Sequence, residues 1–153
     1  MSRCVVFLAV AMLVACDARE LAERNATARE AEAQEDTVEI ADEAYDLVRF
    51  DTIDWGSEEF VLDRGQLVWQ VSCQKCHGAA GAGDAGFVLK GDTLRPPSFL
   101  EADWRYAADV DSLRRYIFKG NAEGMPHWGL IPMTPYDIGA VAVFIQKGLR
   151  AGR

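Results

Sequence analysis

Residues 65–78 read GQLVWQVSCQKCHG, and the end of this stretch is the most informative part of the chain. Cys73 and Cys76 are separated by two residues, and His77 follows the second cysteine directly. Two thiols at this spacing can reach the two vinyl groups of one porphyrin, and the adjacent imidazole then falls beneath the iron as an axial ligand. A zinc site would need about four protein ligands, and a redox dithiol normally accompanies a βαβ pattern, which the sequence lacks. The spacing therefore predicts one covalently bound haem c.

Two further motifs flank the cysteines. Before them, Gly65, Trp69 and Cys73 follow one another at intervals of four residues, and after them Gly124-Met125-Pro126-x-Trp128 precedes a predicted helix. With CQKCHG between them, these motifs make residues 57–150 resemble a class I (small, monohaem) cytochrome c. The resemblance implies an all-α fold of three to four helices around one haem, in which Gly65 lets the first and last helices cross closely. Trp69 is a mild departure, because Phe is commoner at that position.

The sixth position of the iron has more than one candidate ligand. The resemblance places Met125 there, in a Gly-Met-Pro turn 48 residues after His77. His127 is the only other histidine and could substitute if the loop shifts, and an open site is the remaining alternative. Met133 directly precedes a predicted helix cap, where it can pack as a hydrophobic staple, so we interpret it as structural. A His/Met pair raises the potential and saturates the iron, which favours electron transfer over oxygen or peroxide chemistry.

Other residues are weaker candidates for contacts with the haem or with His77. The free N–H of the His77 ring should donate to a carbonyl, and the resemblance assigns that carbonyl to a proline of the following loop, here Pro96 or Pro97. Both prolines could instead merely stiffen the loop. Three more side chains could meet the haem propionates or ring, although each is more often plain packing or surface: Trp104, Arg105 and Tyr116.

Capping residues and apolar spacing predict three helices in this segment. The first begins after Ser57 and would turn one apolar face to the core, made by Phe60, Leu67, Val68 and Val71. The second begins after Asp109 and ends at Gly120. The third begins after Thr134, with proline at its first position, and runs to Gly148. Residues 78–104 hold many Gly and Pro residues without a strong period, so we expect a long loop that wraps the haem.

The first fifteen residues have the pattern of an export signal. A positively charged start precedes a ten-residue apolar run, Val5–Val14, which is too short to span a membrane. Leu13-Val14-Ala15-Cys16 resembles the bacterial lipobox, which predicts lipidation of Cys16 after cleavage; a plain secretory signal is the alternative. Acyl chains on Cys16 would hold the protein to a membrane, and Asp17 slightly favours the periplasmic side of the inner membrane. Cys4 would leave with the signal, so a disulfide framework is not available.

Charge divides the rest of the chain. Residues 17–63 carry sixteen Asp or Glu against four Lys or Arg, whereas residues 64–153 carry eight against eleven. Residues 16–56 are therefore predicted to be an acidic tether, partly helical or disordered, because large apolar residues are nearly absent from most of it. The aromatic residues within 45–60 could dock on a partner, but we favour an extension packed over its own domain. Residues 57–153 form the predicted cytochrome domain.

These features predict a membrane-tethered electron carrier, or a cytochrome subunit of a respiratory or photosynthetic complex. The chain of 153 residues has room for one domain, its net charge of −8 argues against nucleic-acid binding, and its apolar runs are too short for a polytopic membrane protein. Two rival hypotheses remain. A small haem enzyme or ligand sensor would require an open or labile sixth site, and a mainly structural subunit would use the tether to staple a larger assembly.

Overall fold

The computed structural model describes residues 2–89, 91–131 and 133–151, with side chains described from residue 19 onward. The chain divides into two compact units, Met1–Asp36 and Thr37–Arg153. The described part of the first unit is helical and belongs to α1 (Ser2–Glu43), whose last residues belong to the second unit. From residue 19 to residue 36 nearly every side chain is exposed, because Ala, Glu and Arg favour helix but leave no apolar face to bury.

The second unit contains the three predicted helices, α3 (Glu58–Val68), α5 (Val110–Lys119) and α6 (Pro135–Val143). Each begins at its predicted cap: a side-chain oxygen of Ser57, Asp109 or Thr134 accepts a hydrogen bond from the backbone N–H three residues later. Such a bond satisfies a donor that has no partner within the helix. Gly120 ends α5 with a φ of 66°, a left-handed value that glycine adopts without strain. The predictions of these helices are confirmed.

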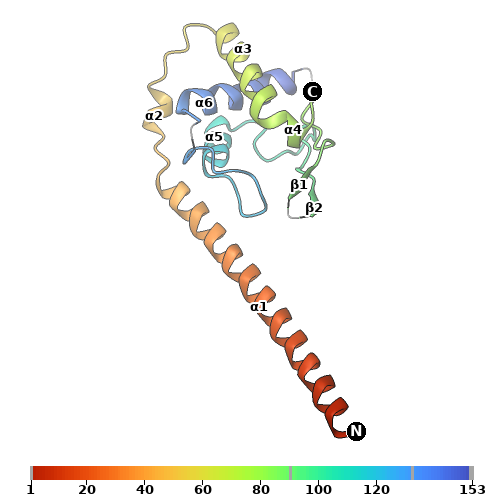
Figure 1. The fold of residues 1–153 in the computed structure, drawn as a ribbon. Coiled ribbons are helices and arrows are strands. Elements are labelled where there is room, and N and C mark those ends of the chain that lie inside the picture. The colour runs from red at the N-terminus through yellow and green to blue at the C-terminus, as the bar shows by residue number, and fades with distance from the viewer. Residues whose placement is uncertain (1, 90, 132, 152–153) are drawn as a thin grey trace. The chain divides into compact units, whose positions relative to one another are not determined.

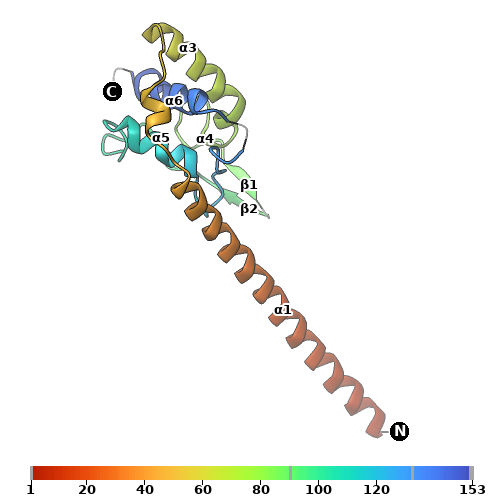
Figure 2. The ribbon, with the colours of Figure 1, turned by 90° about the vertical axis from the view of Figure 1, so that its left-hand side faces the viewer.

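The helices α3 and α6 cross closely, and α5 packs against α6 (Figures 1 and 2). A Cβ at Gly65 would collide with the backbone oxygen of Ala140 and with the Cβ of Phe144. The predicted role of Gly65 at this crossing is therefore confirmed. The core around it is built from buried aliphatic and aromatic side chains of all three helices, including Val68, Leu113, Ile117, Ile138, Val141 and Ile145.

The predicted buried face of α3 is wrong in most of its members. Phe60, Leu67 and Val71 are 54%, 55% and 80% exposed. Val68 is buried as predicted, and the other buried residues of this region are Val61, Gly65 and Trp69. Gly65 explains the difference, because the closest approach of α6 is centred on the residue without a side chain, and residues one turn away from it share its face.

Two regular features interrupt the predicted pattern. The helix α3 continues into a π-helical turn, η1 (Trp69–Cys73), and then into the short helix α4 (Gln74–His77); α6 similarly continues into η2 (Phe144–Leu149). The predicted loop 78–104 contains an antiparallel pair of strands, β1 (Phe87–Leu89) and β2 (Asp92–Leu94). Strands of three residues are too short for alternation to reveal them. The fold is otherwise helical, as expected for a small cytochrome c.

The segment between α1 and α3 packs onto the rest of the second unit. Phe50, in the short helix α2 (Val48–Asp51), is 2% exposed and stacks with Tyr45 at 5.2 Å between ring centroids. Trp55 lies 4.6 Å from the Tyr136 ring of α6. The expectation that the aromatic segment covers its own domain is confirmed. Residues 37–56, which the sequence assigned to the tether, thus belong to the compact unit that begins at Thr37.

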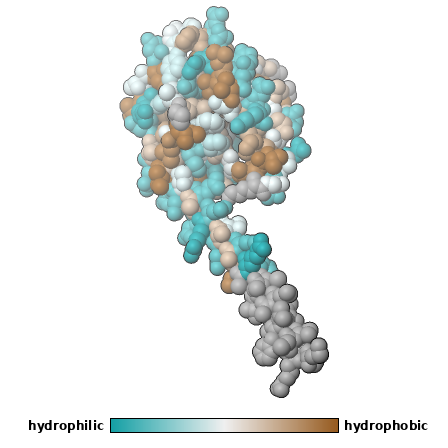
Figure 3. All heavy atoms as spheres, in the orientation of Figure 1, coloured by the Kyte–Doolittle hydropathy of each residue, from teal (hydrophilic) through white to brown (hydrophobic). Residues whose placement is uncertain are grey.

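Exposed apolar side chains on the face shown in Figure 3 are scattered among hydrophilic ones rather than gathered in one continuous patch. Among the described residues, no helix combines the length and the hydropathy required to cross a membrane. The predicted signal peptide, residues 1–15, and the predicted lipidation of Cys16 concern side chains outside the described part of the chain. Both remain predictions.

Candidate functional site

The Cys73-Gln74-Lys75-Cys76-His77 motif lies where α3 ends. Cys73 closes the π-helical turn η1, and the other four residues form α4. Gly78 then ends the helix at a φ of 81°, with its N–H donating to the Gln74 carbonyl at 2.8 Å. π-Helical turns are rare in proteins, and those that occur are often found at functional sites. One continuous helical rod therefore presents both thiols and the imidazole, and it turns sharply away directly after His77.

Burial controls the ionisation of this motif. Burial lowers the pKa of His77 to about 4, so the imidazole is neutral at neutral pH and can act as a ligand. Burial, and secondarily the neighbouring Cys76, raises the pKa of Cys73 to about 12. Reactive dithiols have lowered pKa values, so the environment of Cys73 does not favour a redox dithiol. Within the described residues, no three His, Cys, Asp or Glu side chains are grouped to hold a metal ion.

Aromatic rings enclose His77. Its imidazole stacks on Phe99 with 4.8 Å between centroids, and the Trp69 ring lies 5.9 Å away. The Trp69 indole N–H donates to the Ala79 carbonyl at 3.2 Å, which ties the helix to the loop that follows His77. Neither Phe99 nor this bond was predicted from the sequence. Phe99 follows Pro97-Ser98 in an irregular loop, where no periodicity marks a buried position.

His77 Nδ1 is buried and has no hydrogen-bond partner among the described residues. The predicted bond to the carbonyl of Pro96 or Pro97 is therefore not formed in this structure. Pro96 nevertheless lies close by: a Cβ at Gly83 would collide with the Pro96 carbonyl oxygen, and the Gly83 N–H donates to the His77 carbonyl at 2.8 Å. Pro97 is exposed.

A chain of aromatic contacts leads from His77 toward Met125. Phe99 contacts Trp104 at 5.0 Å, Trp104 contacts Tyr106 at 5.6 Å, and Tyr106 contacts Tyr116 at 5.3 Å between centroids. Two of the three residues that the sequence proposed for the haem surroundings, Trp104 and Tyr116, thus belong to one wall. The third, Arg105, is exposed, with its guanidinium 5.4 Å from the Tyr106 ring. The rings of this wall pack on one another, and Phe99 and Trp104 are buried.

The Met125 loop folds back on the end of α5. Met125 is half-buried and packs against the core. His127 Nδ1 lies 2.6 Å from the Lys119 carbonyl, and because a carbonyl can only accept, this nitrogen donates and its ring is tied to α5. The Gly129 N–H donates to the Phe118 carbonyl at 2.9 Å. The loop that carries both candidate sixth ligands is thus held at several points.

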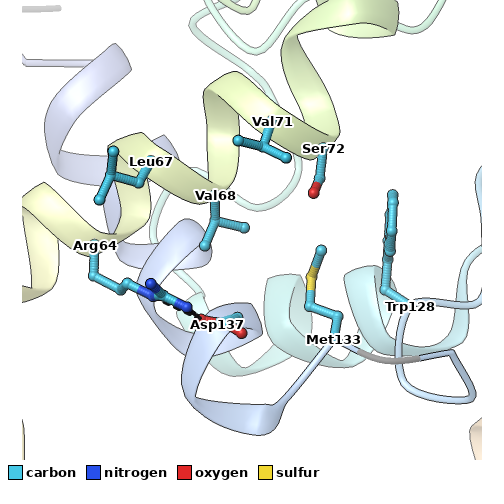
Figure 4. Close-up of a pocket in the computed structure, with 8 residues that line it drawn as sticks. All are labelled: Arg64, Leu67, Val68, Val71, Ser72, Trp128, Met133 and Asp137. Carbon is cyan, nitrogen blue, oxygen red and sulfur yellow. Dashed lines mark hydrogen bonds and ion pairs between the residues drawn. The ribbon is translucent and has the colours of Figure 1, made fainter.

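Met133 lies in a different environment. It lines a cavity of about 330 Å³ beside α3, together with Arg64, Leu67, Val68, Val71, Ser72, Trp128 and Asp137. Figure 4 shows its thioether reaching toward Ser72, beside the Trp128 ring, with Arg64 paired to Asp137. The cavity adjoins the helix that bears Cys73, but its lining includes neither that cysteine nor His77 nor Met125.

These residues fit a c-type haem. His77 supplies a neutral, buried imidazole that stacks on the Phe99 ring. Cys73 and Cys76 are free cysteines that flank it. Haem chemistry requires this donor set: two thiols for thioether attachment and an axial nitrogen.

The chain is similar to known proteins in this region. A family model described as cytochrome c oxidase, cbb3-type, subunit III, matches residues 61–145. The cbb3-type cytochrome c oxidase subunit CcoP of Cereibacter sphaeroides is 27% identical over 104 residues, which are 68% of this chain and 29% of that protein. The subunit of the same name from Rubrivivax gelatinosus is 27% identical over 81 residues, 53% of this chain and 24% of that protein. The chain thus spans less than a third of the length of these relatives. No solved structure matches it.

Proposed function

This chain belongs to the family of cytochrome c oxidase, cbb3-type, subunit III, and from that premise we propose that it transfers single electrons through one covalently bound haem c. Membership makes it a class I c-type cytochrome domain. The observation that carries the proposal is the CQKCH motif at the end of α3, inside the matched region, with a buried and neutral His77. The sequence holds this pattern once, which supports a single haem.

We assign the axial ligands to His77 and Met125. The haem supplies the one-electron Fe(II)/Fe(III) couple, and the protein holds it by two thioethers, Cys73 and Cys76, and by two axial atoms. His127 is the alternative ligand: its Nδ1 donates to the Lys119 carbonyl, which leaves its Nε2 free to bind a metal. We favour Met125 because the resemblance places the methionine, not the histidine, at this position. A saturated iron excludes small ligands, which distinguishes a carrier from a haem enzyme or ligand sensor.

The proposed partner is a membrane-bound oxidase, because the relatives from two organisms carry the name of a cbb3 oxidase subunit. The protein would either remain bound to such a complex or act as a mobile carrier beside it.

We further propose that Cys16 is lipidated and that the protein faces the periplasm from the inner membrane. Labelling with a radioactive fatty acid should then mark the wild-type protein and not a Cys16→Ala variant, whereas an unlabelled wild type would refute the anchor.

A potentiometric titration of the purified holoprotein tests the function. We expect a single reversible one-electron transition, and we expect that carbon monoxide leaves the spectrum of the reduced protein unchanged. Rapid binding of carbon monoxide by the wild-type protein would favour the enzyme or sensor instead.

A deletion tests whether the tether serves mainly to hold a larger assembly together. It should stop at residue 36, because Phe50 and its neighbours belong to the folded unit. A carrier keeps its redox behaviour without residues 17–36.

A further inference from the structure

Asn121 is bonded to Met125 through both its side chain and its backbone. Its Oδ1 accepts a hydrogen bond from the Met125 N–H at 3.0 Å, and its own N–H donates to the Met125 carbonyl at 3.2 Å. The two bonds close a small ring that contains the backbone of both residues. The loop between them, residues 122–124, is therefore fixed at its base.

The base of the loop can form because of Gly120. This residue ends α5 at a φ of 66°, and a Cβ there would collide with the carbonyl oxygens of Met125 and Pro126. The chain thus leaves the helix, passes through Asn121 and returns against the same backbone. Because of this return, the backbone of Met125 lies against the end of α5.

The Asn121 side chain is itself oriented. Its Nδ2 donates to the Tyr116 hydroxyl at 2.8 Å, which leaves Oδ1 directed at the Met125 N–H. Tyr116 lies on α5, one turn before its end, and its ring contacts Tyr106 at 5.3 Å. The last ring of the aromatic wall from His77 is thereby connected to Met125.

We propose that Asn121 is a positioning residue that holds the Met125 thioether at the haem iron. This proposal rests on the proposed coordination of the haem iron by Met125. A loop fixed at its base loses less conformational freedom when Met125 binds, so the bound state is favoured over a competing ligand. A hydrogen bond of this kind contributes about 1 kcal/mol, which corresponds to about a fivefold change in an equilibrium constant.

Imidazole competition on the oxidised holoprotein measures this contribution. Imidazole binds the iron only after Met125 leaves, so its apparent affinity reports how firmly the thioether is held. Asn121→Leu removes both side-chain bonds at similar volume, and we expect about a fivefold rise in imidazole affinity. Asn121→Asp keeps an acceptor for the Met125 N–H, and its second carboxylate oxygen can accept from the Tyr116 hydroxyl, so this variant should bind imidazole like the wild type. Tyr116→Phe removes only the Nδ2 partner, and its affinity should rise by about twofold.

Asp109→Ala is the matched control. It removes the N-terminal cap of the same helix, at the end remote from Asn121, and so lowers stability without changing the bonds between Asn121 and Met125. Its imidazole affinity should equal that of the wild type. If Asn121→Leu and Tyr116→Phe also match the wild type, or if Asp109→Ala rises equally, Asn121 has no positioning role. Absence of a thioether charge-transfer band in the wild-type protein would instead refute the coordination by Met125 itself.

Discussion

Trp69 shows how much one side chain contributes beyond its ring. The Trp69 ring makes an edge-on contact with Phe99 at 5.8 Å between centroids, which a phenylalanine at this position could also make. Phenylalanine could not supply the indole N–H that donates to the Ala79 carbonyl. Tryptophan at this position therefore adds a direct tie between the helix that ends at Cys73 and the loop after His77.

We accordingly expect Trp69→Phe to lower the free energy of unfolding of the holoprotein by about 1–2 kcal/mol, from the lost bond and the smaller ring. Denaturant titration monitored by the haem absorbance measures this, and the slope with denaturant should be unchanged. A variant as stable as the wild type would show that the bond to Ala79 contributes nothing.

Among the contacts between secondary-structure elements, the close crossing of α3 with α6 is the one on which the site depends. The obstacles to a Cβ at Gly65 include the backbone oxygen of Ala140, which cannot swing away as a long side chain can. Any added atom must push the two helices apart, and α3 continues directly through η1 to Cys73.

Gly65→Ala should therefore lower the free energy of unfolding by about 3 kcal/mol, since strain at the crossing exceeds the gain in helix propensity of about 1 kcal/mol. The matched control is Gln66→Ala, at the next and exposed position of the same helix, where we expect a change within about 0.5 kcal/mol. Thermal unfolding of both holoproteins decides the matter. Equal stability of the two variants would contradict the close crossing.

The helices and their caps could be predicted from the sequence because caps are local: Ser57, Asp109 and Thr134 bond to backbone three residues away. The buried face of α3 could not be predicted from the sequence, because it depends on the side from which α6 approaches. The motif Cys73–His77 predicts the attachment site by spacing alone. The surroundings of His77 could not be predicted, because Phe99 comes from an irregular loop.

At the scale of the whole molecule, an ion pair joins the end of α1 to α5. Arg115 Nε and Nη2 donate to the two carboxylate oxygens of Asp42, each at 2.8 Å. The hydrogen bond from Arg115 is the main cause that lowers the pKa of Asp42 below its ordinary value of 3.8, against the opposing effect of burial. Ala41, the residue before Asp42, is fully buried.

A carboxylate with a lowered pKa stabilises the folded state above its ordinary pKa, and this contribution is lost as the pH falls through the folded value. Asp42→Asn should therefore be less stable than the wild type at pH 7, and the difference should shrink as the pH falls below 3.8 through the lowered pKa of Asp42. Unfolding curves across this range test it, with the exposed Asp36→Asn as control. A difference that persists unchanged at low pH would show that charge is not the cause.

The haem is expected to complete the core of the second unit. In the described part of residues 78–104, regular structure is limited to two strands of three residues each. A Cys73→Ala/Cys76→Ala variant without haem should lose cooperative unfolding, as followed by circular dichroism, because a unit of this size with one long loop has a thin core. Native-level, cooperative helicity in residues 37–153 of that variant would contradict this view.

The most direct test of the central claim is the spectrum of the oxidised holoprotein, examined for the weak charge-transfer band that a thioether ligand gives to ferric haem. We predict the band in the wild type, its loss in Met125→Ala and its retention in Met133→Ala, whose thioether lies at a separate cavity. A band that survives Met125→Ala and disappears in Met133→Ala, or a wild type without the band, would contradict coordination by His77 and Met125.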